Sequence, residues 1–184
     1  MSEIQANKLS PASGTALQVG DSGDTITIPS GATITNNGTQ TGFGGTNTSL
    51  FKAYYTGNGS ISANTNTKIV FNNEYFDSNN VYDTSTGKFT APESATYFFL
   101  AQFYVGTALS RLQVRLFKNG SILEIIGFSG DNAGAVTGST ILSLAQNDYI
   151  EIYARSVDGN SIYGNTSSGE LTRFEGYKLI TWVH

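Results

Sequence analysis

Two glutamates within hydrophobic segments are the strongest candidates for acid–base chemistry. Glu151 lies between Ile150 and Ile152, and Glu124 follows an apolar residue in a similar run. Glycoside hydrolysis requires two carboxyl groups about 5–9.5 Å apart in a cleft. Alternation with isoleucine instead predicts that Glu151 lies on the solvated face of a strand, and we expect the same of Glu124. The pattern therefore disfavours a glycosidase.

The sequence also offers little for nucleophilic catalysis. Its one histidine is His184, at the C-terminal end, and it contains no cysteine and no G-x-S-x-G segment. A serine triad would depend on that terminal imidazole, where chains are commonly least ordered. The glycine-rich run 42–45 lacks the following Lys-Ser/Thr of a phosphate-binding loop. We therefore expect no enzymatic activity.

Oxygen ligands for a metal ion occur in turn-like segments. Asp21 with Asp24, and Asp131 with Asn132, could offer carboxylate and amide oxygens to Ca²⁺. Asp and Asn in loops serve more commonly as turn formers, because their side chains bond to the nearby backbone. We expect no metal site and no cofactor, with calcium binding at these turns as the alternative.

Composition and charge exclude several classes of protein. The 184 residues include 11 Phe and 10 Tyr, and the net charge is −4. So much aromatic area favours a folded chain over a disordered one. An acidic surface repels phosphate, so no nucleic-acid partner is expected. Membrane insertion is not expected either, because no run approaches the roughly 18 apolar residues that cross a bilayer.

Residues 1–45 contain short alternating apolar runs separated by turn residues. Ile26, Ile28 and Ile34 follow the period of two that is typical of strands. So few apolar side chains in one chain cannot offset about 1–2 kcal/mol of backbone entropy per residue. We interpret this segment as a β-rich fibrous shaft in which three chains surround one axis and these isoleucines fill its centre. A flexible leader is the alternative.

From Leu50 onward the sequence is typical of an all-β domain. No segment has sustained helical periodicity, and Asn119-Gly120 is a hairpin signal between two alternating runs. Many short antiparallel strands without helices indicate a sandwich or a jelly roll. The expected strands are 51–55, 68–72, 96–105, 112–118, 122–128, 140–144, 149–155, 161–163 and 173–183.

The block from Lys68 to Phe99 resembles the complement C1q globular head, a tumour-necrosis-factor-like jelly roll. The matching aromatic and acidic positions are Phe71, Asp77, Tyr82, Phe89, Tyr97 and Phe99. Two positions depart from the pattern, since Ala95 replaces a glycine and Ala101 replaces an aromatic residue. The resemblance covers about residues 50–184 and implies an antiparallel jelly-roll sandwich. We therefore expect two parts, residues 1–45 and a head domain 46–184.

The segment Thr96–Val105 predicts a strand that is apolar on both faces. A strand of this kind must be covered on both sides. One face serves the sandwich core, and the family resemblance implies that the other faces a threefold axis. We therefore expect a homotrimer, with packing of both faces inside a monomer as the alternative. The residues assigned to the trimer interface and core are Tyr82, Phe89, Tyr97, Phe99 and Phe103.

The segment from Lys8 to Gly44 is similar to the N-terminal parts of tail-fibre and other virion appendage proteins of marine bacteriophages. This resemblance implies that residues 1–45 attach the chain to other virion proteins. Residues 1–14 have no basic start and no apolar core, so no signal peptide is expected. A protein that assembles in the host cytoplasm and leaves with the virion needs none.

Turn residues of the head indicate where a partner would bind. Counting alternating strands back from the C-terminus predicts that Asn119, Asn147, Asp148 and Asn165 lie at the tip, away from the first residue of the head. Amide and carboxylate groups suit polyols, and three copies add avidity. We expect a short tail or head fibre that binds a host-surface glycan or protein. A capsid decoration or joining protein without a receptor, and a soluble cellular lectin-like module, are the alternatives.

Overall fold

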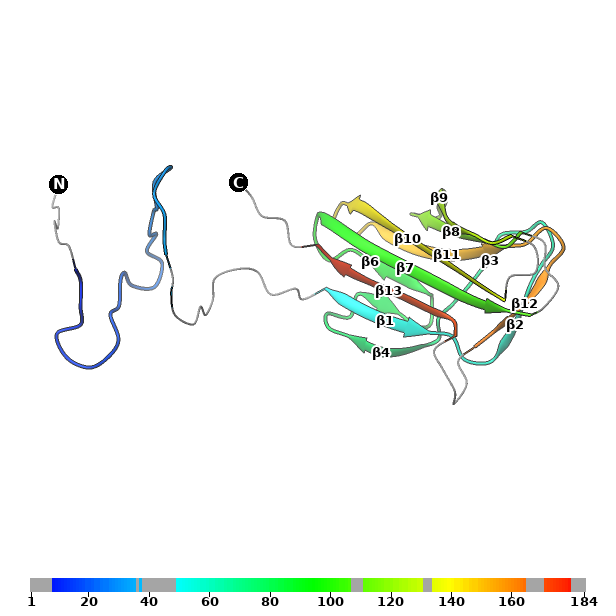
Figure 1. Cartoon of the computed structure of the whole chain (residues 1–184), viewed down its shortest axis with the longest axis horizontal. Coiled ribbons are helices and arrows are strands. Elements are labelled where there is room, and N and C mark those ends of the chain that lie inside the picture. The colour runs from blue at the N-terminus through cyan, green and yellow to red at the C-terminus, as the bar shows by residue number, and fades with distance from the viewer. Residues whose placement is uncertain are drawn as a thin grey trace. The chain divides into compact units, whose positions relative to one another are not determined.

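The computed structural model describes residues 8–35, 37, 49–106, 111–130, 134–164 and 171–179. The chain divides into two units, Met1–Phe43 and Gly44–His184 (Figure 1). We refer to them as the N-terminal unit and the head. Every strand of the described residues lies in the head.

The described part of the N-terminal unit contains turns and no strand. The amide of Asp24 donates to the carbonyl of Asp21 at 3.0 Å, which closes one of the expected turns. Ile26, Ile28 and Ile34 are 60%, 48% and 58% exposed. A lone chain thus leaves the predicted shaft residues in water, because an isolated strand has no neighbour to pair with. The three-chain shaft stays a prediction.

The head is an antiparallel sandwich of two sheets. Its strands are β1 (Leu50–Tyr54), β2 (Asn58–Ile61), β3 (Thr67–Lys68), β4 (Asn73–Asp77), β5 (Tyr82–Asp83), β6 (Lys88–Thr90), β7 (Ala95–Val105), β8 (Gln113–Lys118), β9 (Ser121–Phe128), β10 (Ala135–Leu144), β11 (Tyr149–Arg155), β12 (Asn160–Tyr163) and β13 (Arg173–Lys178). The seven-stranded sheet has the order β2-β12-β7-β13-β1-β4, with β10 also paired to β7. The six-stranded sheet has the order β5-β6-β11-β8-β9, with β3 paired to β11.

The core lies between the sheets and is rich in aromatic rings. Tyr97, Phe99 and Phe103 of β7 are fully buried, as the alternation predicts. The ring of Phe89 lies 5.3 Å from that of Tyr97 and 5.0 Å from that of Phe99. Tyr82 is also buried, and its hydroxyl accepts a hydrogen bond from the backbone. All five residues assigned to the trimer interface and core therefore belong to the core of one chain.

One expected strand, 68–72, is a crossing between the sheets instead. β3 ends at Lys68, and β4 of the other sheet begins at Asn73. Ile69 and Phe71 are buried between them, which explains their strand-like alternation. The amide of Phe71 donates to the Tyr82 hydroxyl at 3.1 Å rather than to a neighbouring strand.

The two ends of the head differ in what they carry. β1 begins and β13 ends at the same end, since Leu50 lies opposite Tyr177, and we call this end the base. We call the opposite end the tip; it carries β2 and β12 (Figure 1, right). The described residues form no helix, so none of them makes a helix long and apolar enough to cross a membrane.

Truncation of Phe174 is predicted to destabilise the head strongly. Its ring is fully buried and lies 4.9 Å from Phe51, 5.6 Å from Phe71 and 5.9 Å from Phe99. Phe174→Ala should lower the free energy of unfolding by about 3–5 kcal/mol, measured by urea denaturation. Leu9→Ala, at a 62% exposed position of the N-terminal unit, is the control and should change it by less than about 0.5 kcal/mol. Equal effects would contradict this description of the core.

Candidate functional site

Three of the four residues expected at the tip lie at the base. β10 ends beside the start of β7, with Leu144 opposite Ala95, so the turn with Asn147 and Asp148 lies at the base. β8 ends beside the start of β11, which places Asn119 at the same end. The predicted location of these three residues is therefore wrong. Asn165 lies outside the described residues.

The error has a topological cause. β12 and β13 both pair antiparallel with β7, so they run in the same direction. The count from the sequence assumed that the chain reverses direction between β12 and β13. Because it does not, every earlier turn lies at the end of the head opposite to the one predicted. The β9–β10 and β11–β12 connections, expected at the base, consequently lie at the tip.

Asn119 and Asp148 join two turns of the base. The Asn119 side-chain amide donates to Asp148 Oδ1 at 2.7 Å, and its Oδ1 accepts from the Tyr149 amide at 2.9 Å. Asp148 Oδ2 lies 2.7 Å from Lys118 Nζ and accepts from the Ala145 amide at 2.8 Å. These polar atoms are engaged within the head. Both side chains thus have a structural role that sequence reasoning did not assign.

Asn147 is a turn former with an exposed side chain. Its φ of 69° is left-handed, a conformation that asparagine tolerates better than most residues. Its amide donates to the carbonyl of Ala91 at 2.8 Å, which ties the turn to the segment after β6. Of the three base residues, Asn147 is the one whose side chain stays open to a partner.

A row of apolar side chains crosses the outer face of the seven-stranded sheet near the base. The register places Ile141 of β10 opposite Phe98 of β7, Phe98 opposite Tyr177 of β13, and Tyr177 opposite Leu50 of β1. Ile141 is 60% and Tyr177 42% exposed. We call these four residues the apolar row. The alternation over residues 96–105 puts Phe98 on the face opposite Tyr97 and Phe99, but Phe98 was not among the residues assigned to a site.

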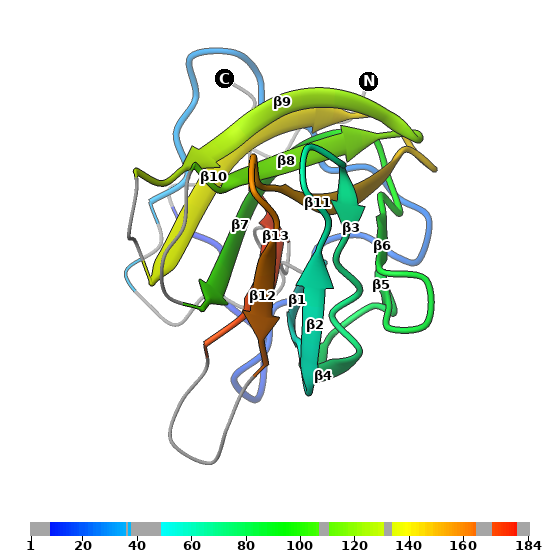
Figure 2. The same cartoon turned by 90° about the vertical axis from the view of Figure 1, so that its right-hand side faces the viewer.

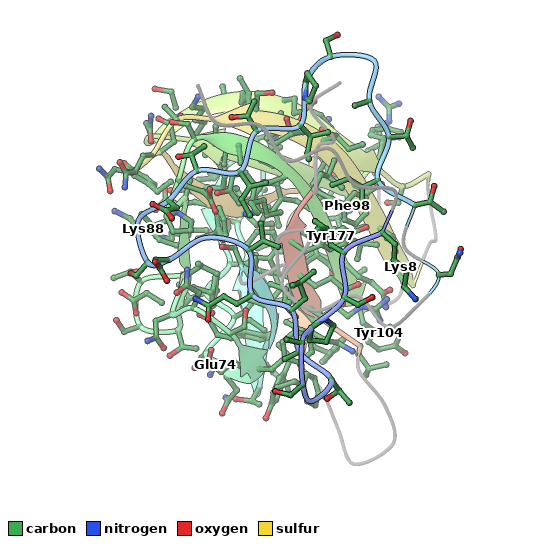
Figure 3. The ribbon with its side chains drawn as sticks, turned by 90° about the vertical axis from the view of Figure 1, so that its left-hand side faces the viewer. Lys8, Glu74, Lys88, Phe98, Tyr104 and Tyr177 are labelled. Carbon is green, nitrogen blue, oxygen red and sulfur yellow. The ribbon has the colours of Figure 1, made fainter. Side chains whose placement is uncertain are left out.

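The apolar row borders a shallow pocket of about 230 Å³. Phe98 and Tyr177 line it with their rings 5.2 Å apart, and Phe76 of β4 lines its other side. Phe76 is 46% exposed. Figure 3 shows Phe98 and Tyr177 together on one side of the sandwich, with Lys88 on the opposite side. This concave apolar surface is suited to an apolar partner.

A second apolar surface lies along one edge of the sandwich. β9 is the edge strand of its sheet, and β10 runs beside it (Figure 2). The two strands approach so closely that a Cβ on Gly138 would lie 2.6 Å from the Ile126 carbonyl. The exposed apolar side chains of β9, which we call the apolar edge, are Ile122, Leu123, Ile125 and Phe128.

The two glutamates considered for acid–base chemistry are both at least partly withdrawn from solvent. Glu151 is 5% exposed and forms an ion pair with Lys68, so its expected position on a solvated strand face is wrong. Lys68 comes from β3, which pairs with β11, and a partner from another strand is not revealed by the alternation around Glu151. One carboxyl oxygen of Glu124 is buried without a hydrogen bond.

The described residues contain no group of three or more His, Cys, Asp or Glu side chains that could hold a metal ion. Asp24 Oδ2 accepts a hydrogen bond from the Asp21 amide at 2.8 Å, which is the role of a turn former. Asp131, Asn132 and His184 lie outside the described residues. The calcium alternative at 131–132 is thus untested.

Acid should weaken the junction between the two base turns. Lys118, then Asn119 and the Ala145 amide, lower the pKa of Asp148 from 3.8 to about 2. A carboxylate with a lowered pKa in the folded state stabilises the fold above its unfolded pKa, and this contribution is lost as the pH falls from about 4 to 2. Asp148→Asn should therefore flatten the loss of thermal stability across that window, measured by calorimetry.

Asp158→Asn is the matched control, because Asp158 is exposed and makes no hydrogen bond or ion pair within the described residues. It should leave the wild-type pH dependence unchanged. Asp148→Asn with an unaltered slope between pH 4 and 2 would show that Asp148 does not hold these turns.

Comparison with known proteins identifies the head. The sequence profile of the C1q domain matches residues 51–179. The globular domain of zebrafish complement 1qA protein is 17% identical, with a TM-score of 0.52 over 71% of this chain and 97% of that one. Eiger TNF from S. frugiperda is 9% identical, with a TM-score of 0.58 over 76% and 97%. Murine APRIL is 12% identical, with a TM-score of 0.54 over 71% and 98%.

At these identities the solved structures show the fold alone. They confirm the expected C1q/TNF-like jelly roll, with its two antiparallel sheets. No curated protein sequence matches the chain. The C1q profile nevertheless spans more than half of the residues, from the second residue of β1 to just beyond β13. The chain therefore belongs to the C1q domain family.

Proposed function

We propose that the chain is a homotrimeric binding module in which the apolar row of each copy is covered by a neighbouring copy. The observation that carries this proposal is the continuous row from Ile141 to Leu50 with its concave apolar pocket. Large exposed apolar patches are uncommon on monomeric proteins. Burying an aromatic side chain contributes about 1.5–3 kcal/mol, and a trimer repeats each contact three times.

The two apolar surfaces of the head favour a closed ring. The apolar row lies on a sheet face, whereas the apolar edge lies along β9, so the two are different surfaces. A contact between the face of one copy and the edge of the next is heterologous, and such contacts generate rings when the rotation closes. Three is the number of subunits that the resemblance to the C1q family implies.

We further propose that this trimer is a virion appendage. Residues 1–45 would attach it to other virion proteins, and the similarity of residues 8–44 to marine phage tail-fibre segments supports this role. The exposed isoleucines of the N-terminal unit fit the same assembly, because three chains would bury them along one axis. The head would then bind a host-surface glycan or protein, and the site of action would be the virion.

A charge placed in the apolar row should dissociate the trimer. Tyr177→Glu puts a carboxylate beside Phe98, and burying an unpaired charge at an interface costs several kcal/mol. Light scattering should give three times the 19.6 kDa chain mass for the wild type and a single chain mass for the variant at micromolar concentration. Thr90→Asp places a similar charge at an exposed position of the other sheet and should stay trimeric. A monomeric wild type would refute the proposal.

Removal of residues 1–45 should separate attachment from assembly. If this segment joins the virion, the truncated chain should be absent from purified particles while its head stays trimeric. Immunoblotting of particles and light scattering of the purified chain measure the two properties. Truncated chain found on particles at the wild-type level would contradict the attachment role. Particles made with the truncated chain also distinguish a receptor-binding fibre from a decoration protein. If the chain is a receptor-binding fibre, these particles should adsorb less to the host, and if it is a decoration protein, their adsorption should be unchanged.

A further inference from the structure

Two arginines lie together on the outer face of the six-stranded sheet toward the tip. Arg115 of β8 and Arg155 of β11 are diagonal neighbours, since Arg155 pairs with Gln113 in the register. Arg115 Nε and Nη2 donate to Gln113 Oε1, and its Nη1 donates to Asn66 Oδ1 at 2.9 Å. Arg155 Nη2 donates to Asn64 Oδ1 at 3.0 Å. Amide oxygens are thus the acceptors at both guanidinium groups.

No carboxylate neutralises this pair within the described residues. None of the ion pairs found there involves Arg115 or Arg155. Two acidic residues lie near Arg115 in the register. Glu151 is engaged with Lys68, and Glu124 of β9 lies opposite Leu116 and forms none of the described ion pairs. Burial lowers the pKa of Arg115 most, and the nearby charge of Arg155 lowers it further.

The side-chain amides of Gln113, Asn66 and Asn64 hold the guanidinium groups in place but, being neutral, do not neutralise their positive charge. A guanidinium carries five N–H donors, and the described bonds occupy three at Arg115 and one at Arg155. The remaining donors can bind two oxygens of one anionic group, such as a carboxylate or a sulfate ester, in the paired geometry that arginine favours. Because the side chains are already held in place, binding would cost less rotamer entropy than at free arginines.

An aromatic surface adjoins the arginines. The rings of Phe117 and Tyr153 stack with their centroids 4.0 Å apart, and Tyr153 lies directly opposite Arg115 in the register. Both rings are half-buried on the same outer face. An oxyanion bound to Arg115 would therefore bring the rest of its molecule against apolar ring atoms. This combination suits a charged sugar, which carries an anionic group on a ring with apolar faces.

The arginines lie away from the apolar row. They lie on the six-stranded sheet, whereas the apolar row lies on the outer face of the seven-stranded sheet. Figure 2 looks onto the tip, where β11 and β8 run behind the β2–β3 segment that supplies Asn64 and Asn66. A neighbouring copy seated on the apolar row would not contact the arginines, whereas the apolar edge adjoins them, because Ile125 lies opposite Arg115.

We propose that Arg115 and Arg155 form a binding site for the carboxylate or sulfate ester of an acidic saccharide, with Phe117 and Tyr153 contacting its ring. This assignment deepens the proposed function, since it names a surface and a ligand class for the head, and it rests on that function only for its biological setting. The site differs from the turn residues that sequence reasoning selected. It needs neither a trimer nor a virion to bind.

Calorimetric titration of the full-length chain tests the site. The probes are tetragalacturonate, which carries carboxylates, a heparin-derived tetrasaccharide, which carries sulfate esters, and neutral maltotetraose. The variants are Arg115→Gln and Gln113→Glu, the second of which places a carboxylate on the guanidinium without removing it. Lys88→Gln is the control, because Lys88 is a cation of the same sheet that lies over the Tyr149 ring, 4.1 Å from its centroid.

The wild type and Lys88→Gln should bind at least one acidic probe, while Arg115→Gln and Gln113→Glu should each lose tenfold or more in affinity at an unchanged thermal midpoint. Preference for tetragalacturonate assigns the site to carboxylates, and preference for the heparin fragment assigns it to sulfate esters. No binding of either acidic probe at millimolar concentration would overturn the proposal. Equal binding of maltotetraose, or full affinity in Gln113→Glu, would overturn it as well. Light scattering of the same samples reports the trimer separately, so the two proposals can fail independently.

Discussion

The central constraint of this protein is a strand that carries bulky apolar side chains on both faces. The inward side chains of β7 are buried against the second sheet, and among the described residues of the head that sheet is the only other layer. Phe98 points the other way, and the neighbouring strands align Ile141, Tyr177 and Leu50 with it. A sandwich can cover each of its sheets on one face only. The outer apolar face therefore calls for a second molecule, and an identical copy offers the apolar edge of β9 to meet it.

This constraint divides the head into surfaces with separate tasks. In the proposed trimer, the seven-stranded sheet would face the neighbouring copies near the base, where Tyr177 and Leu50 lie. The base turns are held by Asp148 and Asn119, which keep their polar atoms within the head. The six-stranded sheet has a polar and aromatic outer face, and its unneutralised arginines are available to a ligand. In these proposals, recognition uses a different sheet face from the apolar row, and the apolar edge of β9 adjoins that face.

The sequence predicts the parts that depend on local pattern and misses those that depend on topology. Alternation over 96–105 predicts β7 and its buried rings, and the C1q resemblance predicts the fold. The segment 68–72 alternates equally well, yet it crosses between the sheets. A crossing segment can bury Ile69 and Phe71 as a strand would, so the alternation does not distinguish the two. The direction of a strand cannot be read from its own residues. The prediction assumed that β12 and β13 run in opposite directions, although they run in the same one, and it therefore assigned Asn147 to the wrong end. The arginine pair was missed because Arg115 and Arg155 are far apart in sequence and become neighbours only through the register of β8 and β11.

Hydroxyl-radical footprinting of the intact chain tests the central claim most directly, because it reports which side chains are covered in solution. In a single chain, Tyr177 is 42% exposed and Tyr75, farther along the same face, is 48% exposed. If neighbouring copies cover the apolar row, Phe98 should be oxidised several-fold more slowly in the concentrated wild type than in Tyr177→Glu. Phe98 and Tyr177 should both be oxidised several-fold more slowly in the concentrated wild type than in dilute, dissociated chain. Oxidation of Phe98 at the same rate in concentrated and dissociated samples would show that no partner covers this face.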